Sequence, residues 1–220
     1  MKVTDIDKCI KLLDNAEIAN LRDFLVFQRQ IAIMDENKAD TKQITAIKKV
    51  LNANTKARPI LNSCQHTSDG SQFICEGYFA VLWKNYNDML DGLNQVDSDQ
   101  SIKFNSIWKS YEVVDTIEVT DDELLLIKNA RKYDKINKYS YLYVLNRLFR
   151  SSYIADMYDI IFKYIDLKSA RIYASENESE PIYIETDEVK IILLPCRCEK
   201  CEREDQIEKQ KDFLNKIKGN

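Results

Sequence analysis

The chain has 220 residues, of which 45% are hydrophobic and 31% are charged, a composition typical of a globular protein with a substantial core. It contains no apolar run near the roughly 20 residues that cross a bilayer, which argues against a membrane-spanning protein. A net charge of -4 and a pI near 5.3 argue against a protein that coats nucleic acid over its whole surface, but they permit a local basic face.

The residues from Met1 to Asp7 contain no basic stretch followed by an apolar core, so we expect no secretory signal and a cytoplasmic protein. The six cysteines are then expected to be reduced thiols.

Apolar residues at helical spacing predict a helical segment over residues 1–38, although the run Phe24–Phe27 fits a strand equally well. Another helix is predicted after Thr41. Its apolar face consists of Ile44, Ile47, Val50 and Leu51.

A strand is predicted over Pro59–Cys64, followed by a tight turn at Ser68–Ser71, where glycine tolerates a positive φ. The runs Gln72–Cys75 and Tyr78–Trp83 are predicted to continue an antiparallel meander.

The middle of the chain begins with a polar stretch, Asn85–Ser101, which is predicted to be a loop. Alternating residues predict a strand over Val113–Val119. Thr120–Glu123 has the sequence of a capping box, which predicts the start of a helix over Leu124–Ile136. Another strand is predicted over Tyr139–Leu145.

The last third reads as a short amphipathic helix, Ser152–Ile161, followed by three strands. The strands are predicted over Ala170–Ala174, Pro181–Glu185 and Val189–Leu194. The tail, Glu202–Asn220, carries apolar residues among charges and is predicted to form a further helix.

This last order, a helix, a strand led by Pro181 and a final apolar-Pro-x-Arg at Leu194–Arg197, resembles the carboxyl-terminal half-domain of bacterial DNA polymerase sliding clamps. Residues 41–84 are similar to a clamp half-domain too, although Phe79 and Ala80 stand where the family has Arg and Leu. The resemblance implies an α+β fold of clamp-like half-domains, with helices packed on antiparallel sheets. It divides the chain into the helical segment 1–38, a clamp-like domain 39–198 and a charged helical tail 199–220.

The resemblance implies a non-catalytic processivity or tethering protein on duplex DNA, of the kind that a phage or mobile element carries, without a cofactor. One chain of this size does not encircle DNA, so a ring would be a head-to-tail homo-oligomer. The alternative is a monomeric adaptor or inhibitor that binds a replication or host protein without encircling DNA. A third possibility is a small metal-dependent protein organised by its cysteines.

Basic residues on two helices are the candidates for DNA contact, because cations on one helix face can meet successive phosphates. The alternative is an ordinary solvated helix face. The first set, at i, i+3, i+4 and i+7, is Lys128, Arg131, Lys132 and Lys135; the second is Lys48, Lys49, Lys56 and Arg58.

The resemblance also implies a groove for a partner peptide, an apolar slot with one cationic edge for an extended or turn-like segment. The tail helix would then cover the groove or pair subunits. Carried over position by position, the groove residues are Cys75, Gly77, Tyr78, Phe79, Ala80, Ile192, Leu194, Pro195, Cys196 and Arg197.

Three cysteines near the end, Cys196, Cys198 and Cys201, have a spacing that could hold zinc with a fourth ligand. The candidates for that ligand are Cys64, Cys75 and His66. A structural zinc site normally shows a second close pair, which this sequence lacks, so reduced thiols are favoured. The single histidine is interpreted as a strand residue, and no catalytic residue is predicted.

Overall fold

The computed structural model describes residues 28, 38, 40–52, 59–97, 99–108, 117–137, 140–197 and 200–219. The chain divides into two compact units, Met1–Thr45 and Ala46–Asn220. Most of the predicted segment 1–38 lies outside the described residues. A helix over residues 40–52 confirms the one predicted after Thr41, and its Ile47 and Leu51 are buried.

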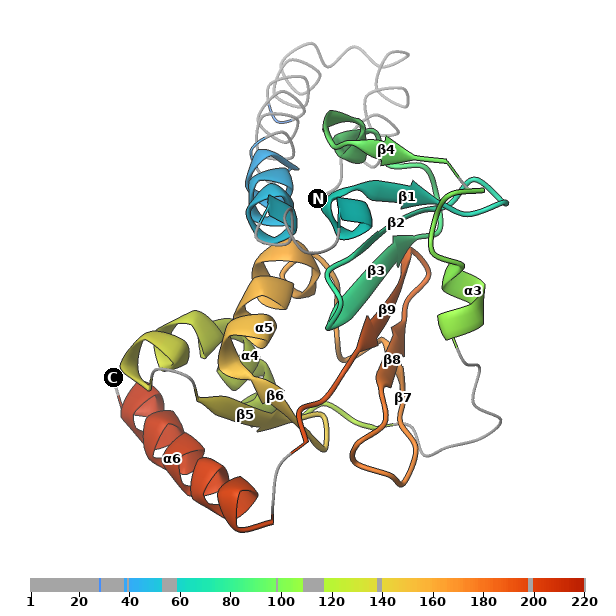
Figure 1. Cartoon of the computed structure of the whole chain (residues 1–220). Coiled ribbons are helices and arrows are strands. Elements are labelled where there is room, and N and C mark those ends of the chain that lie inside the picture. The colour runs from blue at the N-terminus through green and yellow to red at the C-terminus, as the bar shows by residue number, and fades with distance from the viewer. Residues whose placement is uncertain are drawn as a thin grey trace, which may run out of the picture. The chain divides into compact units, whose positions relative to one another are not determined.

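The second unit is an α+β structure built on a seven-stranded sheet with the order β4-β1-β2-β3-β9-β8-β7 (Figure 1). Each neighbouring pair is antiparallel except β1 and β4, which are parallel. The strands are β1 (Cys64–His66), β2 (Gln72–Cys75), β3 (Phe79–Trp83), β4 (Gln95–Val96), β7 (Arg171–Tyr173), β8 (Ile182–Glu185) and β9 (Val189–Leu193).

Two similar halves meet at the centre of this sheet. The first is the helix that ends at residue 52 followed by β1–β3. The second is α5 (Ser151–Met157), continued by the π-helical turn η3 (Tyr158–Phe162), followed by β7–β9. Antiparallel pairing of β3 with β9, from Phe79 opposite Leu193 to Trp83 opposite Val189, joins the halves into one sheet.

The remaining described elements include a hairpin and a long helix. Strands β5 (Tyr141–Val144) and β6 (Arg147–Arg150) form a two-stranded sheet through a turn at Leu145 and Asn146, both with positive φ. Positive φ at both central residues matches the twist of a two-residue hairpin. The other elements are η1 (Pro59–Asn62), η2 (Asp88–Gly92), α3 (Phe104–Ile107), α4 (Asp121–Ile136) and α6 (Lys200–Lys218).

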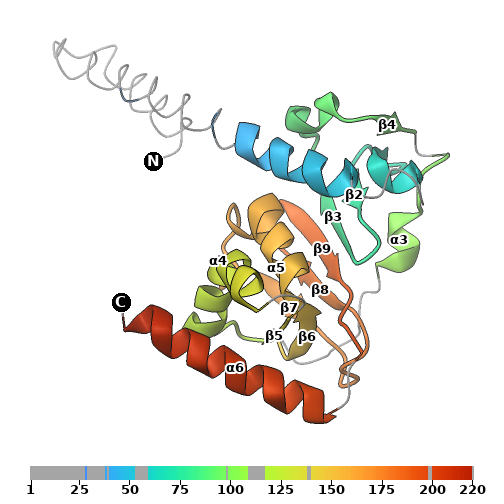
Figure 2. The same ribbon diagram turned by 60° about the vertical axis from the view of Figure 1, so that its left-hand side comes forward.

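Alternating side chains give the large sheet two apolar faces. On one face, Ile74, Val81 and Ile191 join the main core, to which α4 and α5 contribute. On the other face, residues such as Ala80 and Ile192 form a smaller core with Phe104 and Trp108. Figure 2 shows α4 and α5 on one side of the sheet and α3 on the other. The second face is therefore covered by only a short helix among the described elements.

Several predicted elements are confirmed. Gly70 lies in the turn between β1 and β2 with φ 86°. Thr120 and Glu123 form the predicted capping box at the start of α4. Strands β7, β8 and β9 and the tail helix α6 form where they were predicted.

Three predictions differ from the structure. Residues Pro59–Asn62 form a 3-10 turn before β1, because proline has no N–H to donate to a ladder and its fixed φ suits a helical start. The predicted loop Asn85–Ser101 contains η2 and β4, and Asn87 caps η2 by accepting from Met89 N–H. In the predicted strand Val113–Val119, residues 113–116 lie outside the described part and residues 117–119 are not a strand.

The tail helix does not cover the predicted groove. It packs on β5 and α4, with Phe213 and Leu214 buried in the main core. In the part of the chain that the structure describes, no helix is long and apolar enough to cross a membrane.

Candidate binding pocket

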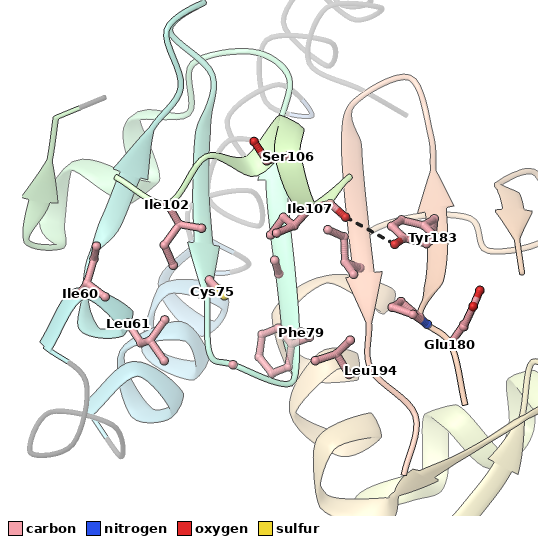
Figure 3. Close-up of a pocket in the computed structure, with 14 residues that line it drawn as sticks. Ile60, Leu61, Cys75, Phe79, Ile102, Ser106, Ile107, Glu180, Tyr183 and Leu194 are labelled. Atoms are coloured by element: carbon pink, nitrogen blue, oxygen red, sulfur yellow. Dashed lines mark hydrogen bonds between the residues drawn. The ribbon is translucent and has the colours of Figure 1, made fainter. Parts of the chain in front are cut away.

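A pocket of about 750 Å³ opens on the sheet face that carries the smaller core (Figure 3). Its floor is formed by Ala80 of β3, Ile192 of β9 and Tyr183 of β8, which lie side by side in the strand register. The other lining residues are Ile60, Leu61, Cys75, Gly77, Phe79, Ile102, Ser106, Ile107, Glu180, Pro181 and Leu194.

The short helix α3 is fixed over this sheet face by aromatic contacts. The Phe104 ring lies 5.3 Å from that of Phe73, and Trp108 meets Tyr183 edge to face at 5.3 Å. The Tyr183 hydroxyl also donates to the Ile107 carbonyl at 3.4 Å. These anchors hold α3 above one part of the sheet, while the small side chain of Ala80 leaves space beside it.

The pocket surface is largely apolar and reaches solvent. Ile107 and Leu194 line it and are 38% and 37% exposed. Ser106, Glu180 and the Tyr183 hydroxyl supply polar groups. The described lining contains no histidine, lysine or arginine. Such a surface has the chemical character of a site for apolar groups.

Six of the ten predicted groove residues line this pocket, because β2, β3 and β9 are neighbours in one sheet. They are Cys75, Gly77, Phe79, Ala80, Ile192 and Leu194.

The other four predicted groove residues lie beyond the pocket lining. Tyr78 is 50% exposed and stacks on Tyr153 of α5 with ring centres 4.5 Å apart. After Leu194 the chain continues along β6, where the Cys196 N–H donates to the Leu148 carbonyl at 2.7 Å. Pro195 and the exposed Arg197 therefore follow β6, and Arg197 does not form a cationic edge of the pocket.

The predicted basic stripe on α4 is divided by an ion pair. Arg131 donates to Asp156 and to Asp159, each at 2.7 Å, and so lies against α5 and η3. Burial opposes the charge of Arg131, but the two carboxylates outweigh burial and raise its pKa.

Three lysines of the stripe remain exposed: Lys128, Lys132 and Lys135 make no ion pair with any residue that the structure describes. Lys48 and Lys49 are exposed on the helix over residues 40–52. Lys56 and Arg58 lie outside the described residues.

The cysteines do not form a described metal site. Cys198 and the side chain of Cys201 lie outside the described part, and within it no group of three histidine, cysteine or acidic residues could hold a metal. Burial raises the pKa of Cys196 and raises that of Cys64 to about 12. His66 Nε2 lies 2.7 Å from Gln95 Oε1, which fits its interpretation as a strand histidine.

No sequence pattern predicted the cluster of three cations around Glu185. Glu185 lies 2.8 Å from Lys84, 3.7 Å from Arg171 and 4.0 Å from Lys190. Burial opposes ionisation of Glu185, but the hydrogen bond from Lys84 and the other cations lower its pKa. The cluster depends on the register of four strands and their flanks, which no local sequence pattern reveals.

Comparison with known proteins finds no matching family model, curated protein or solved structure.

Proposed function

We propose that this chain is a non-catalytic interaction module whose pocket receives apolar side chains from a partner protein. The observation that carries this proposal is the apolar pocket of about 750 Å³ with exposed Ile107 and Leu194 at its border. Each methylene group that a partner buries there contributes about 0.8 kcal/mol, so a few aliphatic side chains account for specific binding.

The floor of the pocket argues for a helical partner segment in place of an extended one. Strands β3 and β9 lie inside the sheet, between β2 and β8, so their backbone groups already have neighbours. A partner strand finds no unpaired strand edge here, and its own backbone polar groups would be buried without hydrogen-bond partners. A helix satisfies its backbone internally and presents apolar side chains at i, i+3, i+4 and i+7.

A peptide selection tests this proposal directly. The full chain is used to select from a library of displayed random 16-residue peptides, and the selected peptides are titrated against Ile107→Glu and Leu194→Glu. Both positions are more than one-third exposed, so we expect the fold to tolerate the changes. Ile136→Glu, at an apolar residue of α4 that is 62% exposed, is the matched control.

We expect at least a tenfold loss of affinity in both pocket variants and no change in the control. The selected peptides should carry apolar residues at helical spacing. Peptides that bind the pocket variants and the wild type equally would exclude the pocket as the site. Peptides that lose affinity in the pocket variants but carry alternating apolar residues would support the pocket as the binding site and exclude a helical partner.

A second candidate function is tethering to duplex DNA by an arrangement like that of clamp half-domains. It is supported by the two halves, each a helix followed by three antiparallel strands, and by the exposed Lys128, Lys132 and Lys135. In this proposal several copies associate head to tail around the duplex. Three lysine–phosphate contacts predict a slope of about -3 for log affinity against log salt.

Duplex titrations at two salt concentrations test the second candidate. The triple change of Lys128, Lys132 and Lys135 to glutamine should abolish the salt-dependent binding, whereas the same change at exposed Lys103, Lys209 and Lys211 should not. Equal binding by the two triple variants would reject α4 as the contact surface. A monomeric mass in solution would reject the ring.

A further inference from the structure

The outer edge of the β5–β6 hairpin is closed by amide side chains of α6. The N–H of Tyr143 donates to Gln210 Oε1 at 2.9 Å, and the Tyr143 carbonyl accepts from Gln210 Nε2, also at 2.9 Å. Gln206 Oε1 lies 3.5 Å from the Tyr141 N–H. Gln210 is only 8% exposed, so this contact is part of the packed structure.

The two glutamines repeat at the spacing of a strand edge. Residues four apart on a helix are separated by about 6 Å along its axis, and outward-facing residues two apart on a strand by about 6.8 Å. Gln206 and Gln210 can thus meet Tyr141 and Tyr143 in succession, as a neighbouring strand would. Figures 1 and 2 both show α6 running alongside β5.

The covered strand has the composition of an edge that pairs with other chains. Residues Tyr141–Val144 are Tyr-Leu-Tyr-Val, without a charge, a proline or a glycine. Natural edge strands usually carry charged residues or proline, which prevent association with other chains, or they are covered by another element. In this chain the cover is α6.

The contacts of α6 differ along its length. Its carboxyl-terminal half is anchored in the main core, where Phe213 packs edge to face on Tyr133 with ring centres 5.1 Å apart. The described contacts of its amino-terminal half are polar: Gln206 reaches Tyr141, and Arg203 lies 5.8 Å over the Tyr143 ring while pairing with Glu178 between β7 and β8. To uncover β5, α6 must separate from the hairpin as far as Gln210, one turn before the anchor at Phe213 and Leu214.

We propose that α6 is a displaceable cover of the β5 edge, and that the uncovered edge pairs with β5 of a second copy. Two identical strands can pair antiparallel about a two-fold axis, so the edge is complementary to itself. Each copy supplies to the other the N–H and C=O partners that Gln210 supplies in the monomer. The interaction surface is separate from the pocket and does not depend on the proposed function.

The test compares Gln210→Leu with Asn215→Leu in the full chain. Both changes replace an amide with leucine on α6, but Asn215 is exposed and lies about 140° around the helix from Gln210. Hydrogen exchange of the Tyr143 amide and the mass by light scattering are measured over a hundredfold range of concentration. We expect at least tenfold faster exchange in dilute Gln210→Leu and a dimer at high concentration, with neither change in Asn215→Leu.

Two further variants separate the cover from the pairing. Gln210→Glu keeps an acceptor for the Tyr143 N–H but loses the donor to the Tyr143 carbonyl, so it should restore only part of the protection. Adding Tyr141→Lys to Gln210→Leu places like charges near the two-fold axis and should return the protein to a monomer. A Tyr143 amide that stays protected in dilute, monomeric Gln210→Leu would overturn the cover. A variant that stays monomeric, or a dimer that survives Tyr141→Lys, would overturn the pairing through β5.

Discussion

The backbone N–H of Leu145 donates to Oε1 of Glu123 at 2.7 Å, while the other carboxylate oxygen accepts from the N–H and hydroxyl of Thr120. One side chain therefore completes the capping box of α4 and also holds the turn between β5 and β6. Leu145 has φ 53°, a left-handed conformation that costs a residue with a side chain about 1–2 kcal/mol. The bond from Glu123 helps to offset this strain.

Replacing Glu123 by alanine should lower the free energy of unfolding by about 2 kcal/mol, because a helix cap and the partner of the Leu145 N–H are lost together. Urea denaturation measures the change. Glu118→Ala removes a carboxylate at an exposed position just before the helix and should change stability by less than about 0.5 kcal/mol. Equal losses in the two variants would contradict the double role of Glu123.

Replacing Arg131 by glutamine should cost about 1 kcal/mol of stability, because two carboxylates on the neighbouring helix lose their cation. The same change at the exposed Lys132 should be nearly neutral. A double-mutant cycle of Arg131→Gln with Asp156→Asn and Asp159→Asn measures the coupling. Additive losses, with no coupling, would show that the ion pair contributes nothing.

The stability that Glu185 contributes should disappear in acid. Its pKa in the folded protein is lowered, so the carboxylate is more strongly ionised folded than unfolded. This stabilisation is complete above the ordinary pKa of a glutamate side chain, about 4.3, and is lost as the pH falls through the pKa of the folded protein. Wild type should therefore exceed Glu185→Gln by about 1 kcal/mol at pH 6 and by much less at pH 3. A difference that does not depend on pH would reject this role of the charge.

Cys64 should resist alkylation in the folded protein. Burial raises its pKa to about 12, and its side chain is fully enclosed. At pH 8 both effects prevent iodoacetamide from reaching a thiolate, whereas denaturant should expose the thiol fully. Mass spectrometry of labelled peptides follows the reaction, and the half-buried Cys75 provides the comparison.

The same shift makes stability fall in alkali. The unfolded thiol ionises near pH 8.5–9, while the folded thiol stays protonated, so the free energy of unfolding should decrease from about pH 9 toward pH 12. Cys64→Ala should remove this part of the decrease. An equally steep decrease in that variant would assign the effect to other groups.

Local signals in the sequence predict local structure well. Thr120 and Glu123 determine where α4 begins, and Gly70 determines the turn between β1 and β2, because each acts through neighbouring residues. The strand predicted to begin at Pro59 was wrong at Pro59–Asn62, because an apolar run does not distinguish a strand from a helical turn. The masking of the β5 edge by Gln206 and Gln210 gave no signal, because polar residues on a tail helix look like a solvated face.

The pocket was predictable only in part, because several of its residues come from segments that are brought together by tertiary packing. The residues that line the pocket from β3 and β9 were proposed from the resemblance to sliding clamps, and they meet because the two strands pair. The contributions of η1 and α3 depend on tertiary packing. Arg131 shares a helix face with three lysines, but whether a neighbouring helix supplies carboxylates is decided by the packing of α4 on α5.

The pairing of β3 with β9 has a consequence for synthesis of the protein. These strands are separated by about half of the chain, so a nascent polypeptide exposes the edge of β3 until β9 has left the ribosome. During that interval β3, with the sequence Phe-Ala-Val-Leu-Trp, is open to pairing with other strands. Productive maturation therefore depends on how quickly translation delivers the second half, and slow translation should increase the fraction that aggregates.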